Sequence, residues 1–418
     1  MTTKQCAVFP PELLACIRDR FCHVDSDEIM GQRIYFENAG GSLTLKSVVA
    51  TSARIDSLPD NAGRNNATSE HLGNLIADGR AAVATFLNAQ DGIIVAREGA
   101  TAMLFALVDA VTSEVAGGNV VCSNLDHPAT FDSTAYFCKK RGLERRVAAL
   151  DTTTGTVPVA SVLERVDQET IALVMVHASN VTGGVNDMPG IITAVRAKAP
   201  QAAIILDGTQ FVQHGDANLA ELGVDAYVFA SYKVFSKVGS GFAYVGPRLV
   251  TAPHPGLAGK PETEWDLGTR DAGNFAAFRD VVNYLEWLGG ETGATNEANN
   301  RNRIVSAIEA IGAHEQALGV QLLDGLQRIP GTRVLGDPTA SPNRQAVFAL
   351  AHDRQPASKV VIELAKQGIV VHQRLRDAFC TNVLEAFDAE EVVRVSLAHY
   401  NTRDEVTQFL EAYAHIVQ

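Results

Sequence analysis

Cysteine is scarce in this chain, and its cysteines form no recognisable pair or cluster. The 418 residues contain six, at positions 6, 16, 22, 122, 138 and 380. None forms a Cys-x-x-Cys pair, and no group of His and Cys has the spacing of a zinc site, so we expect no metal. The density is too low for a disulfide scaffold, which predicts reduced thiols in a cytoplasmic protein.

Long apolar runs and an excess of basic residues are also missing. No run of about eighteen apolar residues predicts a membrane span, and the first thirty residues lack the pattern of a signal peptide. The net charge of −13 argues against a nucleic-acid surface and against anchoring to acidic membranes. We therefore expect a globular protein with neither nucleic acid nor membrane as a partner.

Strand-like and helix-like segments alternate between about 72 and 250. The predicted strands are apolar runs at 92–96, 119–123, 146–150, 171–177, 202–206, 226–230 and 241–245. Near-continuous apolar strands indicate a sheet that is covered on both faces. Helices such as 100–113 and 191–198 lie between them, so we expect an α/β fold with a mainly parallel seven-stranded sheet.

The pattern changes after the Pro- and Gly-rich stretch at 251–261. Residues 280–288 and 302–328 have the spacing of long amphipathic helices, and 332–418 reads as strand–helix–strand–helix. We therefore predict three parts, which are an N-terminal helical segment (1–30) that packs on the small domain, a large domain (31–284) and a smaller C-terminal α/β domain (285–418).

Lys233 and Asp207 each follow an apolar run. Lys233 lies in Ala-Tyr-Val-Phe-Ala-Ser-Tyr-Lys (226–233), and Asp207 ends Ala-Ala-Ile-Ile-Leu-Asp (202–207). The spacing leaves room for one helix and one short strand, so neighbouring strands would bring the amine and the carboxylate to one sheet edge. A lysine that forms a Schiff base and an aspartate that holds a proton on the pyridine nitrogen are what an enzyme of pyridoxal 5′-phosphate (PLP) needs.

Other predicted strand ends also carry polar residues, so five strand ends point at one crevice. Ala100 and Thr101 open a helix whose amides suit a phosphate. His127 would stack on a ring or shuttle a proton, although a plain turn histidine is equally consistent with the sequence. Asn180 and Gln210 have the chemistry to hydrogen-bond a phenolic oxygen, or to cap turns.

Five segments in this order resemble the class V aminotransferases of PLP fold type I, within them the cysteine desulfurase and selenocysteine lyase group. The segments are His-Ala-Ser-Asn-Val-Thr-Gly (177–183), Asp-Gly-Thr-Gln (207–210), Ser-Tyr-Lys (231–233), Gly-Thr-Arg (268–270) and Arg-Val-Ser-Leu-Ala-His-Tyr-Asn-Thr (394–402). The resemblance runs from about residue 31 to the C-terminus. It implies PLP as the cofactor, a small amino acid as the substrate, and a homodimer with a shared active site.

The resemblance also implies roles for single residues. The catalytic residues would be Lys233, Asp207 and His127. The cofactor would be held by Ala100, Thr101, His127, Asn180, Asp207, Gln210, Ser231, Lys233 and, from the partner subunit, Thr269. The substrate would meet Asn38, Ala39, Arg394 and His372. Arg394 would clamp the substrate α-carboxylate, because its planar fork suits bidentate binding.

One segment departs from the family pattern. Cysteine desulfurases carry an Arg-x-Gly-x-x-Cys type loop, whose thiolate attacks the substrate sulfur. Here the corresponding stretch, 368–381, lacks that glycine and has His372 where the arginine is expected. Cys380 falls near the right place but out of register, and we expect it to be a buried side chain rather than a nucleophile.

The predicted function is that of a PLP-dependent, desulfurase-like lyase. It would remove a Cα proton from a small amino acid and then eliminate a β-substituent. Aminotransferase and racemase or epimerase chemistry begin in the same way and remain alternatives, and a non-catalytic PLP-binding protein is a remote one. His372, Arg374 and Arg376 would recognise a second acidic group, or simply form a solvated basic loop.

Overall fold

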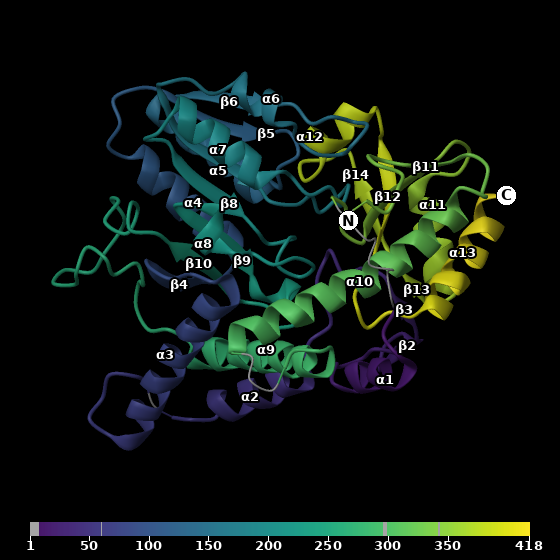
Figure 1. The fold of residues 1–418 in the computed structure, drawn as a ribbon, viewed down its shortest axis with the longest axis horizontal. Coiled ribbons are helices and arrows are strands. Elements are labelled where there is room, and N and C mark those ends of the chain that lie inside the picture. Colours follow the sequence, from purple (N-terminus) through teal and green to yellow (C-terminus); the bar gives the residue numbers. More distant parts are fainter. Residues whose placement is uncertain (1–7, 60, 296–298, 342) are drawn as a thin grey trace.

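A seven-stranded sheet forms the centre of the larger part of the molecule (Figure 1). The computed structural model describes residues 8–59, 61–295, 299–341 and 343–418, so Cys6 and the start of the predicted N-terminal segment lie outside the described residues. The strands lie in the order β4-β10-β9-β8-β7-β5-β6. They are Ile93–Arg97 (β4), Asn119–Ser123 (β5), Glu144–Ala148 (β6), Thr170–Val176 (β7), Ala203–Asp207 (β8), Ala226–Ala230 (β9) and Gly241–Val245 (β10).

Most neighbouring strands of this sheet are parallel. β10 runs antiparallel to both β4 and β9, and the pairs between β9 and β6 are parallel. The prediction of a mainly parallel seven-stranded sheet is confirmed. Three predicted strands have the predicted bounds, and the others are displaced by one or two residues.

Helices cover both faces of the sheet, as near-continuous apolar strands require. On one face α4 (Ala100–Thr112) and α5 (Pro128–Arg141) pack over a core that includes Ile205. On the other, α3 (Ala67–Leu87), α7 (Met188–Lys198) and α9 (Ala272–Glu291) pack over a core that includes Ile204 and Leu206. Successive residues of β8 therefore serve opposite cores, because side chains alternate along a strand.

The C-terminal part is built on a smaller antiparallel sheet in the order β11-β12-β15-β14. Its elements are β11 (Thr332–Val334), β12 (Val347–His352), α11 (Ala357–Lys366), β13 (Ile369–Val370), β14 (His372–Leu375), α12 (Thr381–Leu384), η2 (Glu385–Phe387), β15 (Glu391–Ser396) and α13 (Arg403–Val417). The predicted order of strand, helix, strand and helix was too simple. The additional strands have two to four residues, which is too short for a period of two to show in the sequence.

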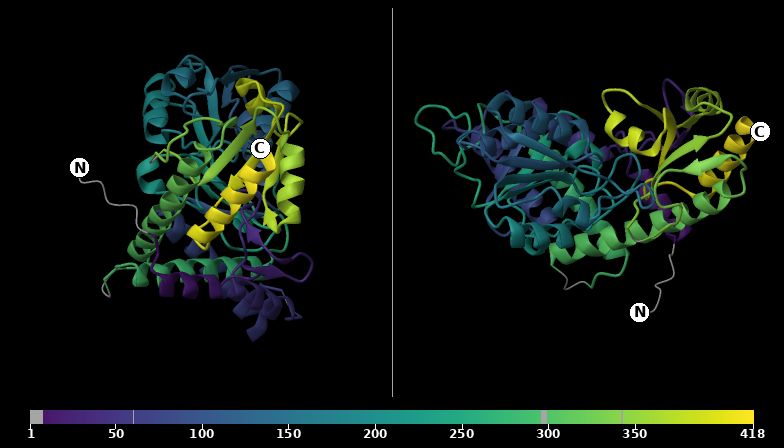
Figure 2. Two further views of the ribbon diagram at one scale, coloured as in Figure 1. Left: turned by 90° about the vertical axis from the view of Figure 1, so that its right-hand side faces the viewer. Right: turned by 90° about the horizontal axis from the view of Figure 1, so that it is seen from above.

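The N-terminal segment contacts both parts. The first elements of the chain are α1 (Pro11–Asp19), β1 (Ser26–Asp27), β2 (Gly31–Gln32), β3 (Ile34–Tyr35) and α2 (Lys46–Asp56). The short elements α6 (Val159–Leu163), α8 (Leu219–Leu222) and η1 (Ser231–Lys233) belong to the larger part of the molecule. β3 pairs with β13, and Phe9 stacks on His314 of α10 (Asn300–Leu326). Arg20 lies over the ring of Trp287 of α9. Helix α10 extends from beside α9 to the small sheet (Figure 2).

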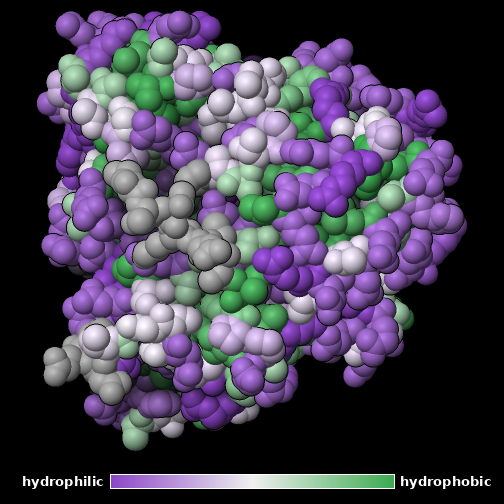
Figure 3. All heavy atoms as spheres, turned by 45° about the vertical axis from the view of Figure 1, so that its right-hand side comes forward, coloured by the Kyte–Doolittle hydropathy of each residue, from purple (hydrophilic) through white to green (hydrophobic). Residues whose placement is uncertain are grey.

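The surface carries both hydrophilic and apolar residues. The face in Figure 3 is mostly hydrophilic, with apolar residues in separate small groups. Among the helices that the structure describes, none is both long and apolar enough to cross a bilayer.

Candidate active site

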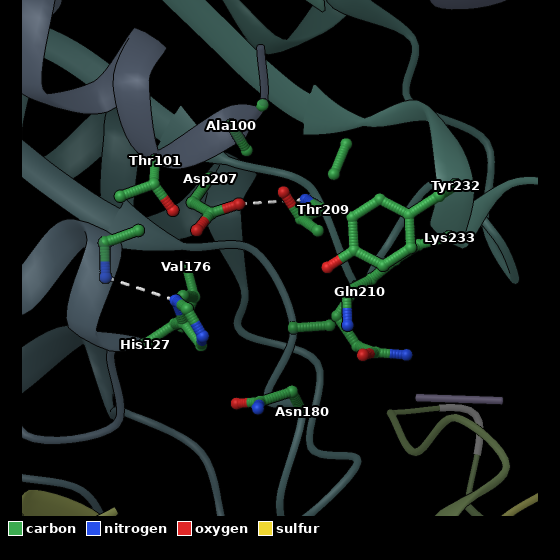
Figure 4. Close-up of a pocket in the computed structure, with 14 residues that line it drawn as sticks. Ala100, Thr101, His127, Val176, Asn180, Asp207, Thr209, Gln210, Tyr232 and Lys233 are labelled. Carbon is green, nitrogen blue, oxygen red and sulfur yellow. Dashed lines mark hydrogen bonds between the residues drawn. The ribbon is translucent and has the colours of Figure 1, made fainter. Parts of the chain in front are cut away.

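One cavity collects residues from five strand ends (Figure 4). They come from the segments that follow β4, β5, β7, β8 and β9, all at the carboxyl edge of the sheet, where open α/β sheets bind ligands. The cavity is lined by Gly99, Ala100, Thr101, His127, Ala129, Val176, Ala178, Asn180, Asp207, Thr209, Gln210, Ala230, Tyr232 and Lys233. Seven predicted site residues are therefore brought together.

Lys233 is the last residue of η1, the turn that follows β9. Its Nζ donates hydrogen bonds to the carbonyl oxygens of Ala39 and Gly40. Burial, and after it the positive charge of Arg394, lower the pKa of the amine to about 7, against the opposing effects of Glu37 and Asp207. An amine with such a pKa is neutral in a large fraction near neutral pH, which is what a nucleophile or base needs.

Asp207 ends β8 and is almost completely buried. Its Oδ1 accepts from the Thr209 amide at 3.0 Å, and its Oδ2 accepts from the Thr130 hydroxyl at 3.5 Å. A second carboxylate, Asp126, lies deeper and accepts from the amides of Ser123 (2.6 Å) and Val176 (2.8 Å). Burial raises the pKa of Asp126 to about 7. Asp126 thus ties the ends of β5 and β7 together, whereas Asp207 faces the cavity.

His127 caps the start of α5. Its Nδ1 accepts from the Ala129 amide at 3.1 Å, so the neutral ring carries its proton on Nε2. Burial lowers the pKa of His127 to about 4. Near neutral pH the cavity therefore contains an uncharged imidazole, which suits stacking on an aromatic ring.

The start of α4 forms one end of the cavity. Its N-cap residue, Gly99, makes no side-chain cap, so the amides of the first turn and the Thr101 side chain border the cavity. A Cβ added at Gly241 of the neighbouring β10 would lie 2.5 Å from the Ala100 nitrogen. Glycine at position 241 therefore lets the helix start come close to the sheet. A helix N-terminus with free amides is a binding site for a phosphate.

Two buried polar atoms at the cavity have no hydrogen-bond partner in the described part of the chain. They are Thr209 Oγ1 and Gln210 Oε1. Buried polar atoms of this kind require a partner. Together with the amine of Lys233, the carboxylate of Asp207 and the amides of α4, they fit a ligand that has an aldehyde, a ring nitrogen, a phenolic oxygen and a phosphate. PLP has these groups.

Arg394 of β15 is buried, but it is already bound by another side chain. Its Nη2 lies 2.6 Å from Glu37 Oε1, and its Nη1 donates to the Asn180 carbonyl oxygen at 3.0 Å. His372, from the neighbouring strand β14, is nearly half exposed and its Nδ1 lies 3.9 Å from the same Glu37 oxygen. The predicted substrate residues Arg394 and His372 therefore meet at Glu37, beside the cavity rather than in its lining.

Three predicted site residues lie elsewhere. Ser231 is buried, and its Oγ bonds to the carbonyl oxygens of Ser240 and Lys237, so it is not part of the lining. The side chain of Asn38 forms hydrogen bonds with Ser396, Asn401 and Tyr400. Asn38 is fully buried, and its role in substrate binding stays a prediction. Thr269 is exposed on the segment between β10 and α9 and does not reach the cavity of its own chain.

Ala39 takes part through its backbone alone, as the acceptor for Lys233.

Cys380 is buried, as predicted, with 1% of its surface exposed. Burial raises the pKa of its thiol, and the nearby Arg374 only partly offsets this. A persulfide-forming cysteine needs an exposed thiolate. The position of Cys380 does not provide one.

Sequence reasoning missed Tyr232, Thr209, Glu37 and Asp126. Tyr232 and Thr209 line the cavity, and each is a direct chain neighbour of a predicted residue. Asp126 directly precedes His127, so its strand-end position was a usable signal. The sequence gives no such signal for Glu37, because its partner Arg394 is 357 positions away.

A lysine and an aspartate that face one cavity at the carboxyl edge of a mainly parallel sheet, next to a phosphate-binding helix start, define a PLP-dependent enzyme of fold type I. Residues 34–409 match the family model of the class-V aminotransferases, and the chain belongs to this family.

Relatives and solved structures agree with the family. Cysteine desulfurases from Salmonella typhimurium and Serratia proteamaculans are each 26% identical to this chain, over 72% of it and 71% of their own length. The fold is similar to that of an apo cysteine desulfurase from Thermococcus onnurineus (TM-score 0.84, 18% identity, 98% of this chain and 99% of that one). It is also similar to that of an Escherichia coli cysteine desulfurase (TM-score 0.80, 21% identity, 98% and 99%).

Proposed function

We propose that the protein is a desulfurase-like lyase that acts on a small amino acid, with L-cysteine as the first candidate. The observation that carries the proposal is that the relatives named cysteine desulfurase match most of the chain. The cavity supports the proposal, since Lys233 and Asp207 both line it at the sheet edge.

Bound PLP would supply an electron sink next to the substrate Cα. The first turn of α4 and Thr101 would hold its phosphate, and Asp207 would keep a proton on its ring nitrogen. His127 would lie against its ring, and Asn180 and Gln210 would hydrogen-bond its phenolic oxygen. Lys233, with its lowered pKa, would take the Cα proton near neutral pH.

The elimination balances without a further reactant other than water. The Cα–H and Cβ–S bonds of cysteine break, the electron pair of the C–H bond enters the new C=C bond, and sulfur leaves as sulfide. Water then converts the enamine product to pyruvate and ammonia. Because Cys380 is buried, this route does not place the sulfur on that thiol.

The test is to incubate the PLP-loaded protein with L-cysteine and a panel of other amino acids. We expect sulfide together with pyruvate from L-cysteine, and no product from the Lys233→Ala variant. Transfer of the amino group to an added keto acid, with a new keto acid formed from the donor, would instead identify an aminotransferase, and a D-amino acid would identify a racemase. No product from any amino acid, with PLP firmly bound, would support a non-catalytic protein.

We also propose a homodimer with a shared active site. Thr269, which by resemblance contacts the partner's cofactor phosphate, lies on a segment that extends away from the body between β10 and α9 (Figure 2). Leu257 and Leu267 on that segment are 54% and 37% exposed. An exposed apolar side chain on a projecting segment is consistent with a contact to a second copy.

A cytoplasmic location and the three-part division at residues 31 and 285 remain proposals. Free thiols at Cys16, Cys22, Cys122, Cys138 and Cys380 support a reducing compartment. The contacts of the N-terminal segment with Trp287 and His314, which both lie beyond residue 285, support packing of the first part on the C-terminal part.

A further inference from the structure

We propose that Glu37 competes with the substrate carboxylate for Arg394. Glu37 holds the arginine until the substrate displaces it. The proposal rests on the assignment of Arg394 as the carboxylate-binding residue. It adds that the affinity for a substrate α-carboxylate is set by Glu37 and not by Arg394 alone.

The guanidinium of Arg394 is engaged on two sides. Nη1 donates to the Asn180 carbonyl oxygen, and Nη2 pairs with Glu37 Oε1 at 2.6 Å. Nε has no hydrogen-bond partner among the described residues, and neither has Glu37 Oε2. Glu37 therefore occupies half of the edge formed by Nε and Nη2. This edge is the one that a carboxylate would bind with both oxygens.

The backbone holds Glu37 in this position. Glu37 forms a parallel bridge with Ser396 of β15, two residues from Arg394. The Ser396 amide donates to the Phe36 carbonyl oxygen at 2.8 Å. The pairing of these two chain segments places the carboxylate beside the guanidinium, so the contact does not depend on a flexible loop.

The pair lies next to the reactive amine. Lys233 Nζ donates to the carbonyl oxygens of Ala39 and Gly40, two and three residues after Glu37. Only 3% of the Arg394 side chain and 17% of the Glu37 side chain are exposed. A substrate whose amine approaches Lys233 would bring its α-carboxylate to this pair, and two carboxylates cannot both occupy the same edge of Arg394.

Gly40 gives an independent way to disturb the pair. A Cβ built on Gly40 would lie 2.2 Å from Glu37 Oε1 and 2.9 Å from its Cδ. These atoms are the far end of a flexible side chain, so a Gly40→Ala substitution would push the carboxylate away from Arg394 while keeping its charge.

The experiment measures the binding of two ligands to the PLP-loaded protein by isothermal titration calorimetry. L-alanine has an α-carboxylate and no β-leaving group, and L-alaninamide lacks only the carboxylate charge. In Glu37→Gln and in Gly40→Ala, we expect the Kd of L-alanine to fall by about tenfold or more, the scale of a close charge pair. The Kd of L-alaninamide should stay within about twofold. Glu390→Gln is the matched control, because Glu390 is exposed and pairs with Arg376 instead.

An unchanged or larger Kd of L-alanine in both variants, with L-alaninamide unchanged, would overturn the proposal. The two substitutions act by charge and by shape, so a folding defect in one leaves the other informative. The result is independent of the proposed lyase activity, because L-alanine cannot lose a β-substituent. A failure to release sulfide from L-cysteine would contradict the proposed function without affecting this measurement.

Discussion

At the scale of single residues, burial decides which groups are available for chemistry. Lys233 and His127 both have a pKa that burial lowers, to about 7 and about 4, so near neutral pH His127 is uncharged and a large fraction of the Lys233 amine is neutral. The thiol of Cys380 is also buried, but burial raises its pKa and keeps it protonated. The same physical effect therefore favours an amine as a base and disfavours a thiol as a nucleophile.

Cys380→Ser should leave turnover within about twofold of the unaltered protein, because a buried thiol makes no contact with substrate. The measurement is sulfide release from L-cysteine, with Lys233→Ala as the inactive reference. Loss of sulfide release in Cys380→Ser, with an unchanged melting temperature, would show that the thiol does take part.

We expect the burial of His177 to make the protein less stable in acid. It stacks on Phe211, its Nδ1 lies 2.9 Å from the Tyr227 hydroxyl, and burial lowers its pKa from 6.5 to about 3. Between these values the unfolded state binds the proton more strongly than the folded state. Stability is therefore full above pH 6.5 and falls as the pH falls, by about 1.4 kcal/mol per pH unit for one such group.

In His177→Phe, the plot of melting temperature against pH should be less steep between pH 6.5 and 5 than in the unaltered protein. Thermal unfolding followed by circular dichroism gives this plot, and only the slope is compared. His415→Asn, at an exposed position, is the control. Parallel plots for the unaltered protein and His177→Phe would contradict the prediction.

At the scale of elements, the contact between β10 and the start of α4 positions the phosphate end of the cavity. Gly241→Ala would place a Cβ 2.5 Å from backbone atoms of Gly99 and Ala100. Since backbone cannot yield as a side-chain end can, the helix start must move. We expect PLP to bind about tenfold more weakly, measured by fluorescence titration. Gly117→Ala is the control, because a Cβ there meets nothing within 4 Å. Equal PLP affinity in both variants would exclude a role for this contact.

At the scale of the whole molecule, the segment between β10 and α9 is expected to join two copies. Leu267→Glu would introduce a charge into the proposed dimer contact, and burying an unpaired charge is costly. Analytical ultracentrifugation should show a dimer for the unaltered protein and a shift toward monomer for Leu267→Glu. Ile362→Glu, on the exposed face of α11, is the control. A monomer in every case would contradict the shared active site.

The sequence by itself determined the sheet, the order of the strands along the chain and the polar residues at the strand ends. These depend on local features, namely apolar runs and the residues that directly follow them. For this reason Lys233, Asp207, His127, Asn180 and Gln210 could be named in advance as neighbours in one crevice. The short strands of the small sheet could not be predicted, because two to four residues carry too little periodicity.

Only the tertiary structure decided what each polar side chain contacts. Asn38 bonds to residues near position 400, and Ser231 bonds to Lys237 and Ser240, although the resemblance assigned both residues to a ligand. Glu37 finds Arg394 across 357 positions. Such partners are brought together by packing between distant segments, so the direction of a side chain and the charge that it meets have no local signature in the chain.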